Sequence, residues 1–307
     1  MDHHFDERTP PDLAWTEGRP AVDGGQEVKT TSVLQAGAAL SAVPSTLRIP
    51  LAARALGERL FPDMAVGDAH AHRLLTALGD DGALWLRDRA SIYGILARTR
   101  RFRELATDFL GRHPAGHIVN LGCGLTDYFQ WLDNGHARMT DADLPEVMAI
   151  RSQLLPPSGP RHAACEVDLT RADWWETLGL PAHRDNAPVF LFSEGVFMYL
   201  TAPVVEAALR TFGERAPPGS VFAFDAMCWL AAGQARRHRS VRHTAAEFRW
   251  GPRRLADLTA PSARLRLAAA HPVMERRGWP YSVLGPVFRA VCGVPFYALY
   301  ELHTFPR

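Results

Sequence analysis

From residue 117 onward, short apolar runs of strand length alternate with stretches of helical pattern. Strand–helix alternation at this spacing predicts an α/β fold with a mostly parallel sheet and helices on both faces. Because the runs are apolar throughout, we expect strands that are buried on both sides. The expected strands lie within 117–121, 137–143, 162–169, 188–195, 220–226 and 296–305, and the expected helices within 145–155, 171–178 and 203–215.

The chain before residue 117 divides into two parts by composition. Residues 1–28 are polar and rich in Pro, Gly and Asp, which is typical of a disordered tail. Residues 84–112 carry apolar side chains at helical spacing. We therefore expect a helical cap over 29–112 and the α/β domain over 113–307, forming one compact unit.

The overall charge favours a small-molecule partner. The 307 residues carry 34 basic and 33 acidic side chains, a formal net charge of +1. This balance argues against a binder of nucleic acid or of membrane surfaces, whose affinity comes from excess positive charge. No apolar stretch is long enough to span a bilayer, and the N-terminus does not resemble a signal peptide.

The four cysteines indicate the compartment. They are scattered and form no C-x-x-C pair, which is typical of reduced thiols in a cytoplasmic protein. The sequence leaves monomer and homodimer open.

Acidic residues and glycines gather where the expected strands end. In open parallel sheets, ligands bind outside the carboxyl ends of the strands. Carboxylates at one rim repel a phosphorylated ligand and suit one with hydroxyls, an amine and a positive charge. The candidates at this rim are Gly122, Gly124, Asp141, Asp143, Asp168, Glu194 and Asp225.

The glycine loop follows the first expected strand as HIVNLGCGLTD (117–127). A dinucleotide fold requires G-x-G-x-x-G, with a pyrophosphate at the helix N-terminus. The third glycine is replaced by Asp127, whose charge disfavours a pyrophosphate beside it. The loop therefore fits a ligand without phosphate, although a purely structural turn remains open.

Asp143 stands 21 residues after Gly122, the distance at which an acid commonly accepts hydrogen bonds from a ribose diol. A helix N-cap is the alternative role, and Asp141 is the second candidate for the ribose. Asp168 is a candidate for an adenine amino group, with Asp173 as the competing helix cap.

Glu194 lies in an otherwise apolar stretch and needs a partner if it is buried. A structural salt bridge is one possibility, and a ligand ammonium or a nearby arginine is the other.

Together these residues resemble the class I methyltransferases that use S-adenosylmethionine. The closest likeness is the leucine carboxyl methyltransferase superfamily, in its bacterial branch of polyketide O-methyltransferases. The resemblance implies a Rossmann-like methyltransferase fold with a seven-stranded, mostly parallel sheet and an N-terminal helical cap. The segments that carry it are ARTRRF (97–102), VNLGCGL (119–125), DADLPEVMAIRSQLLP (141–156), SEGVFMYL (193–200) and FRWG (248–251).

This resemblance also implies the contacts of the cofactor, S-adenosylmethionine. Arg98 would pair with its methionine carboxylate, and Gly122 and Gly124 would pass close to its backbone. Asp143 would hold the ribose hydroxyls. The adenine would lie between Asp168 and Leu169, and Glu194 would lie near the methionine moiety.

One departure concerns the glycine loop. The family usually continues it as Leu-Asp-Thr-Arg, whereas this chain has Leu125-Thr126-Asp127-Tyr128. The order of Asp and Thr is exchanged and the arginine is absent. Contacts that the family assigns to those two side chains are therefore not carried over to this chain.

For the acceptor, a carboxylate is ionised at neutral pH and needs no general base, whereas a phenol benefits from one. No histidine stands in a motif typical of a base, and we expect no bound metal at HAH (70–72). We therefore predict in-line methylation of the carboxylate of an aromatic or polyketide-like acid in secondary metabolism. A phenolic acceptor and a non-catalytic nucleotide-binding protein are the alternatives, and an NAD(P)-dependent oxidoreductase is disfavoured.

Four aromatic residues are candidates for the acceptor pocket. Phe248 and Trp250 are expected to wall it, or else to lie in the core, and Tyr199 and Tyr93 are expected to orient the acceptor. A basic cluster at 235–243, ARRHRSVRH, is either a solvated helix face or a means of drawing an acidic acceptor to the pocket.

Overall fold

Seven strands form one sheet in the computed structural model of the chain, which describes residues 44–181, 187–244 and 246–306. The strand order is β3-β2-β1-β4-β5-β7-β6. The first five strands run parallel, and β7 is antiparallel to both of its neighbours. The strands are β1 (His117–Leu121), β2 (Arg138–Asp143), β3 (His162–Glu166), β4 (Val189–Ser193), β5 (Val221–Met227), β6 (Leu265–Pro272) and β7 (Tyr297–Thr304).

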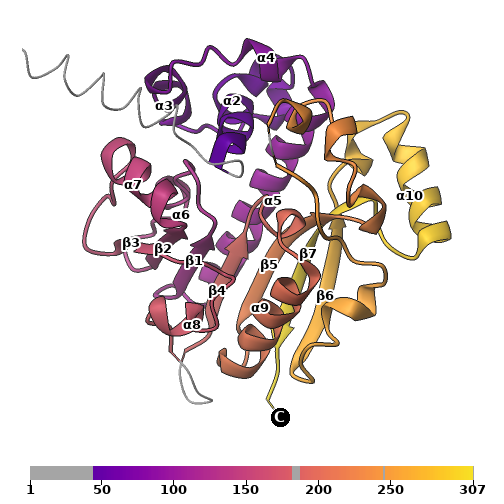
Figure 1. The fold of residues 1–307 in the computed structure, drawn as a ribbon. Coiled ribbons are helices and arrows are strands. Elements are labelled where there is room, and N and C mark those ends of the chain that lie inside the picture. Colours follow the sequence, from indigo (N-terminus) through magenta and orange to yellow (C-terminus); the bar gives the residue numbers. More distant parts are fainter. Residues whose placement is uncertain (1–43, 182–186, 245, 307) are drawn as a thin grey trace, which may run out of the picture.

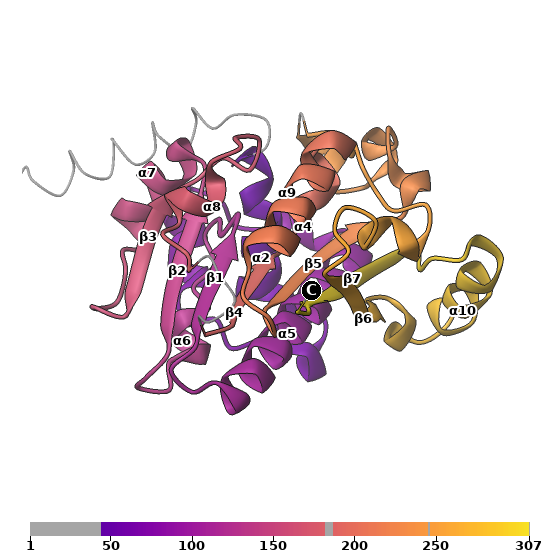
Figure 2. The same ribbon diagram turned by 90° about the horizontal axis from the view of Figure 1, so that it is seen from below.

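The helices cover both faces of this sheet, as predicted (Figure 2). Successive strand side chains point to opposite faces, so the apolar runs supply two separate cores. Phe190 and Phe192 of β4 pack with α5 and α6, while Leu191 between them packs with α8 and α9. The helices are α2 (Arg48–Leu56), α3 (Ala71–Ala77), α4 (Ala83–Leu86), α5 (Arg89–Arg112), α6 (Phe129–Leu132), α7 (Pro145–Leu154), α8 (Trp174–Thr177), α9 (Ala202–Arg215) and α10 (Tyr281–Cys292).

The long helix α5 begins at a cap that the sequence pattern did not show. Asp88 is its N-cap and accepts a hydrogen bond from the Ser91 backbone N–H at 3.2 Å. This satisfies one of the free N–H groups in the first turn. The expected helix over 84–112 is therefore two helices, α4 and α5, separated at Arg87 and Asp88.

Helices α2, α3 and α4 gather at one end of the sheet (Figure 1). Their apolar side chains, among them Leu51 and Leu74, form a third core with Ile92 and Leu96 of α5. The predicted tail over 1–28 and the first part of the predicted cap lie outside the described residues. Over the described ranges, no helix is both long and apolar enough to cross a membrane.

Three features of the sheet differ from the sequence-based expectation. Strand β3 is not buried on both sides, because it forms the edge of the sheet and exposes Ala163, Ala164 and Glu166. Strand β6 and helix α10 were not predicted. Strand β6 is only partly buried along its length. Helix α10 contains Pro286, and a proline normally argues against a helix interior.

Candidate active site

A large cavity of about 1200 Å³ opens beside the carboxyl ends of the parallel strands. One wall consists of the glycine loop and the ends of β2, β3 and β4; it carries the carboxylates of Asp143, Asp168 and Glu194 and is called the polar wall below. The other wall is mainly apolar and comes from α5, the segment between β5 and β6, and α10. Pockets for one ligand usually measure about 300–1,000 Å³, so this cavity is larger than most single-ligand sites.

The glycine loop depends on its two glycines. Gly122 and Gly124 have φ angles of +71° and +51°, a region that side chains with a Cβ rarely adopt. A Cβ at Gly122 would lie 2.3 Å from Val196 Cγ2, and one at Gly124 would lie 2.8 Å from Leu47 Cδ2. Both glycines line the cavity, so the backbone itself forms this part of the wall.

Two buried arginines hold the carbonyl groups of this loop. Arg151 of α7 donates from Nη1 to Gly124 O at 3.0 Å and to Thr126 O at 2.8 Å. Arg54 of α2 donates from Nη2 to Leu125 O at 3.0 Å. The conformation of the loop is therefore fixed from both the sheet domain and the N-terminal helices.

Asp143 lines the cavity at the end of β2. Its Oδ2 accepts from Gly124 N–H and its Oδ1 from Leu144 N–H, each at 2.8 Å. Burial raises the pKa of this carboxyl to about 6, although both hydrogen bonds act in the opposite direction. The N-cap of α7 is Leu144, so the alternative role of Asp143 as the helix cap is wrong.

Asp141, the second candidate for the ribose, does not reach the cavity. It is fully buried and accepts hydrogen bonds from Asn120 Nδ2 at 3.1 Å and from Arg151. His162 Nε2 lies 2.7 Å from the same carboxylate. Asp141 therefore holds Arg151 in place beneath the glycine loop, and the ribose prediction for it is wrong.

Asp168 and Leu169 follow β3 and also line the cavity. Asp168 Oδ1 accepts from the backbone N–H of Thr170 at 2.8 Å and from its hydroxyl at 2.7 Å. Asp173, the competing helix cap, stands at the N-cap of α8 but makes no capping bond with its side chain. It pairs with exposed Arg171 instead.

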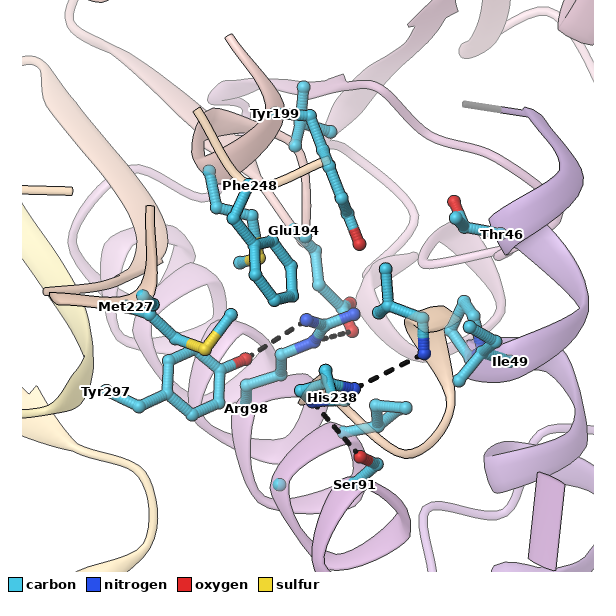
Figure 3. Close-up of a pocket in the computed structure, with 18 of the residues that line it drawn as sticks. Thr46, Ile49, Ser91, Arg98, Glu194, Tyr199, Met227, His238, Phe248 and Tyr297 are labelled. Atoms are coloured by element: carbon cyan, nitrogen blue, oxygen red, sulfur yellow. Dashed lines mark hydrogen bonds and ion pairs between the residues drawn. The ribbon is translucent and has the colours of Figure 1, made fainter. Parts of the chain in front are cut away.

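Arg98 of α5 lies in a buried cluster of polar groups at the cavity (Figure 3). Its Nε donates to Glu194 Oε1 at 3.0 Å, and its Nη1 donates to Asp225 Oδ2 at 3.1 Å and to Tyr297 Oη at 3.0 Å. Burial opposes the charge of Arg98, but Tyr297, Asp225 and Glu194 outweigh it and hold the arginine pKa above its usual value. Glu194 is thus paired with an arginine, one of the two roles predicted for it.

The third nitrogen of Arg98, Nη2, makes no hydrogen bond to any residue that the structure describes. A Cβ at Gly195, whose φ is +73°, would lie only 2.7 Å from it. Gly195 therefore keeps the space at this end of the guanidinium open.

Aromatic rings form part of the apolar wall. The rings of Tyr199 and Phe248 both line the cavity, and their centroids lie 5.6 Å apart. Burial raises the pKa of Tyr199 to about 12, so its hydroxyl stays protonated and does not act as a base at neutral pH.

Comparison with known proteins identifies the family. The family model for leucine carboxyl methyltransferase matches residues 35–213, more than half of the chain. The tetracenomycin polyketide synthesis O-methyltransferase TcmP of Streptomyces glaucescens is 32% identical over 222 residues, covering 69% of this chain and 76% of that protein. The chain belongs to the leucine carboxyl methyltransferase family. It is an S-adenosylmethionine-dependent methyltransferase, as the sequence motifs predicted.

Two further comparisons agree with this assignment. A Parafrankia sp. (strain EAN1pec) protein that carries the name of an S-adenosyl-L-methionine-dependent methyltransferase is 28% identical over 201 residues, covering 60% of this chain and 64% of its own length. A crystal structure of a Thermobifida fusca YX protein, whose description names a methyltransferase, superposes with a TM-score of 0.52 at 15% identity. The match covers 85% of this chain and 94% of that one. The latter supports the fold alone, and the predicted Rossmann-like methyltransferase fold is confirmed.

The departure of this methyltransferase from the family's loop sequence now has a structural account. Asp127 does not line the cavity, and its Oδ2 lies 3.3 Å from His70 Nε2. Tyr128, in place of the family's arginine, donates its hydroxyl to Glu194 Oε2 at 2.6 Å. The loop is thereby tied to the N-terminal helices on one side and to the Arg98 cluster on the other.

Two predicted acceptor residues of the methyltransferase do not line its cavity. Tyr93 packs edge-on against Phe61, with ring centroids 5.4 Å apart, on another side of α5. Trp250 packs against Phe197 and Phe224, in the core on the face of the sheet that α8 and α9 cover. The prediction that they contact the acceptor is therefore wrong, and for Trp250 the core alternative holds.

The basic cluster at 235–243 is not one helix. It forms two short 3-10 helices, Ala235–Arg237 and Val241–His243. Arg237 and Arg239 line the cavity, whereas Arg236 and Arg242 do not.

The structure also brings residues to the cavity that the sequence did not mark, namely Tyr128, Tyr297, Ser91 and His238. No motif carries them, because their partners lie far away in the chain. Among the described ranges, no three side chains of the metal-ligating types come together.

Proposed function

We propose that this methyltransferase transfers a methyl group to the carboxylate of an aromatic or polyketide-like acid. The observation that carries the proposal is the division of the cavity into a polar wall at the strand ends and a mainly apolar wall with Arg237 and Arg239. The polar wall suits the cofactor, and the apolar wall suits a large, flat acceptor. The arginines favour an acceptor that carries negative charge.

The cofactor-binding roles follow from the groups of the polar wall and from Arg98 of the neighbouring helix α5. Arg98 offers its unpartnered Nη2 to the methionine carboxylate, and the carboxyl-rich cluster around it, with Glu194, favours the adjacent ammonium. Asp143 has lone pairs left for the ribose hydroxyls after accepting its two backbone hydrogen bonds. Asp168 and Leu169 border the place for the adenine.

When bound, S-adenosylmethionine supplies an electrophilic methyl group. The protein's own part in the reaction is to hold the acceptor oxygen in line and to exclude water. An ionised carboxylate needs no proton removed before it attacks. Tyr199, with its raised pKa, and the apolar side chains around Phe248 provide walls rather than a base.

We further propose that the helices of residues 29–112 act as a cap on this site. In the described part, Leu47 and Ile49 of this region line the cavity, and Leu47 lies close to Gly124 of the glycine loop. TcmP is named for O-methylation in polyketide synthesis, which is consistent with a polyketide-like acceptor here.

A methyl-transfer screen tests the function. Flat aromatic carboxylic acids and the matched phenols, in which a hydroxyl replaces the carboxyl group, are incubated with S-adenosylmethionine and the products are detected by mass. We expect methyl esters of the acids. Turnover of the phenols without turnover of the acids would contradict the proposal, and so would the absence of S-adenosylhomocysteine binding in calorimetry.

A further inference from the structure

His238 is the only histidine among the described residues that lines the cavity, and it stands on the acceptor side. Its hydrogen-bond partner Ser91 precedes Arg98 by seven residues on α5, which is about 10 Å along the helix axis. Figure 3 shows His238, which belongs to the segment that follows β5, beside Ser91 of α5. The ring is therefore placed to contact the acceptor rather than the methionine end of the cofactor.

The hydrogen bonds of His238 define where its proton lies. Asp88 Oδ2 accepts from the Ser91 hydroxyl at 2.6 Å and from the Ser240 hydroxyl at 3.0 Å. Since the proton of the Ser91 hydroxyl is directed to Asp88, its oxygen is left to accept from His238 Nε2, at 3.4 Å. On the other side of the ring, Nδ1 accepts from Val241 N–H at 3.3 Å. Both contacts require the same neutral tautomer, with the proton on Nε2.

The surroundings keep this ring neutral and fixed. Burial lowers the pKa of His238, and the nearby Asp88 carboxylate only partly opposes this effect. For Asp88 itself, burial acts against ionisation, but the hydrogen bonds from Ser91 and Ser240 outweigh it and hold the pKa below its usual value. The ring of Phe248 lies edge-on to the imidazole, with centroids 5.6 Å apart.

We propose that His238 binds the acceptor by donating a hydrogen bond from Nε2–H to one oxygen of its carboxylate, while the other oxygen is left to attack the methyl group. Ser91 and Asp88 are positioning residues that set the tautomer and the ring orientation. The lone pair of Nδ1 is occupied by Val241 N–H, so the ring is a donor and not a general base. The long contact of 3.4 Å to Ser91 is readily exchanged for a shorter one to a charged oxygen. This inference rests on the proposed carboxylate acceptor.

The test uses anthraquinone-2-carboxylic acid and the matched phenol, 2-hydroxyanthraquinone, with the full-length chain. His238→Ala removes the donor and His238→Gln keeps one. We expect His238→Ala to raise KM for the acid by roughly 10- to 100-fold, the effect of losing a hydrogen bond to a charged group. His238→Gln should recover most of this loss. The affinity for S-adenosylhomocysteine should be unchanged in both variants, and exposed His72→Ala serves as the matched control.

The possible results separate the two proposals. If the wild type converts the acid and His238→Ala has the same kcat/KM within about twofold, the role of His238 is overturned while the function stands. If the wild type converts only the phenol, the proposed function fails. Loss of that phenol turnover in both variants would then make His238 a base and overturn its role as a donor. If neither compound is converted, calorimetry measures binding of the acid to the S-adenosylhomocysteine-loaded protein instead. Weaker binding by His238→Ala than by the wild type supports the role of His238, and equal binding overturns it.

Discussion

Replacing Arg98 by methionine tests the buried cluster at the methionine end of the site. The Arg98 side chain is 10% exposed, and the side chains of Glu194 and Asp225 are 7% and 0% exposed. Removing one partner from a buried, hydrogen-bonded ion pair costs about 3–5 kcal/mol, because it leaves uncompensated charge. We expect Arg98→Met to lower the free energy of unfolding by about this amount near pH 8. It should also abolish binding of S-adenosylhomocysteine.

The loss should depend on pH in a defined direction. Burial raises the pKa of Asp225, and Arg98 is the strongest opposing influence. Without Arg98, the pKa of this carboxyl in the folded state lies still further above its unfolded value. A group of this kind stabilises the fold at low pH and loses that contribution as pH rises through the folded pKa. The deficit of Arg98→Met should therefore be smaller near pH 5 than near pH 8.

Urea denaturation of both proteins at the two pH values measures this difference. Arg101→Met is the matched control on the same helix, since Arg101 forms a partly exposed pair with Glu104 and its replacement should cost less than about 1 kcal/mol. The double variant Arg98→Met/Asp225→Asn should recover part of the stability and lose the pH dependence. A deficit below about 1 kcal/mol, or an equal deficit at both pH values, would refute the reasoning.

Three further predictions concern the glycine loop and its surroundings. Because burial raises the pKa of Asp143 to about 6, binding of S-adenosylhomocysteine in calorimetry should weaken as pH falls through 6. Asp143→Asn should bind weakly with little pH dependence. Equal affinities of the wild type at pH 5 and pH 8 would count against the ribose role. Gly122→Ala places a Cβ 2.3 Å from Val196 Cγ2 at a positive φ, so cofactor affinity should fall sharply. The double variant Gly122→Ala/Val196→Ala removes the clash and should recover only part of the affinity. Full recovery would show that alanine adopts this backbone conformation without strain. Tyr128→Phe leaves Glu194 Oε2 without its 2.6 Å hydrogen bond and should cost about 1.5–3 kcal/mol in denaturant unfolding, whereas an unchanged midpoint would argue against that bond.

Much of the fold could be predicted because the strands are apolar and end at recognisable positions. The runs at 117–121 and 188–195 became β1 and β4, and the candidates at the strand ends, including Asp143 and Asp168, line the cavity as their positions required. Asp141 and Asp225 are exceptions, because both are fully buried and do not line the cavity. Asp141 lies two residues before Asp143 in the same strand. Its partners Arg151 and His162 come from neighbouring elements, and the sequence does not show that they meet.

The acceptor side could not be predicted in the same way. Its residues come from elements that meet only through tertiary packing. Ser91 and His238 are 147 positions apart, and a histidine within a basic cluster carries no signal of its own. Tyr93 was a reasonable candidate by composition, but the orientation of α5 directs it to Phe61 instead.

The contact between Arg54 and the glycine loop has a practical consequence for protein engineering. Arg54 donates to Leu125 O and is held by Asp68 at 2.8 Å, so a residue of the N-terminal helices supplies a hydrogen bond to the backbone of the glycine loop. Grafting the N-terminal helices of a relative onto this chain to change its acceptor preference would remove that donor unless the graft supplies one. Chimeras should therefore transfer Arg54 and Asp68 together, or keep both from the recipient.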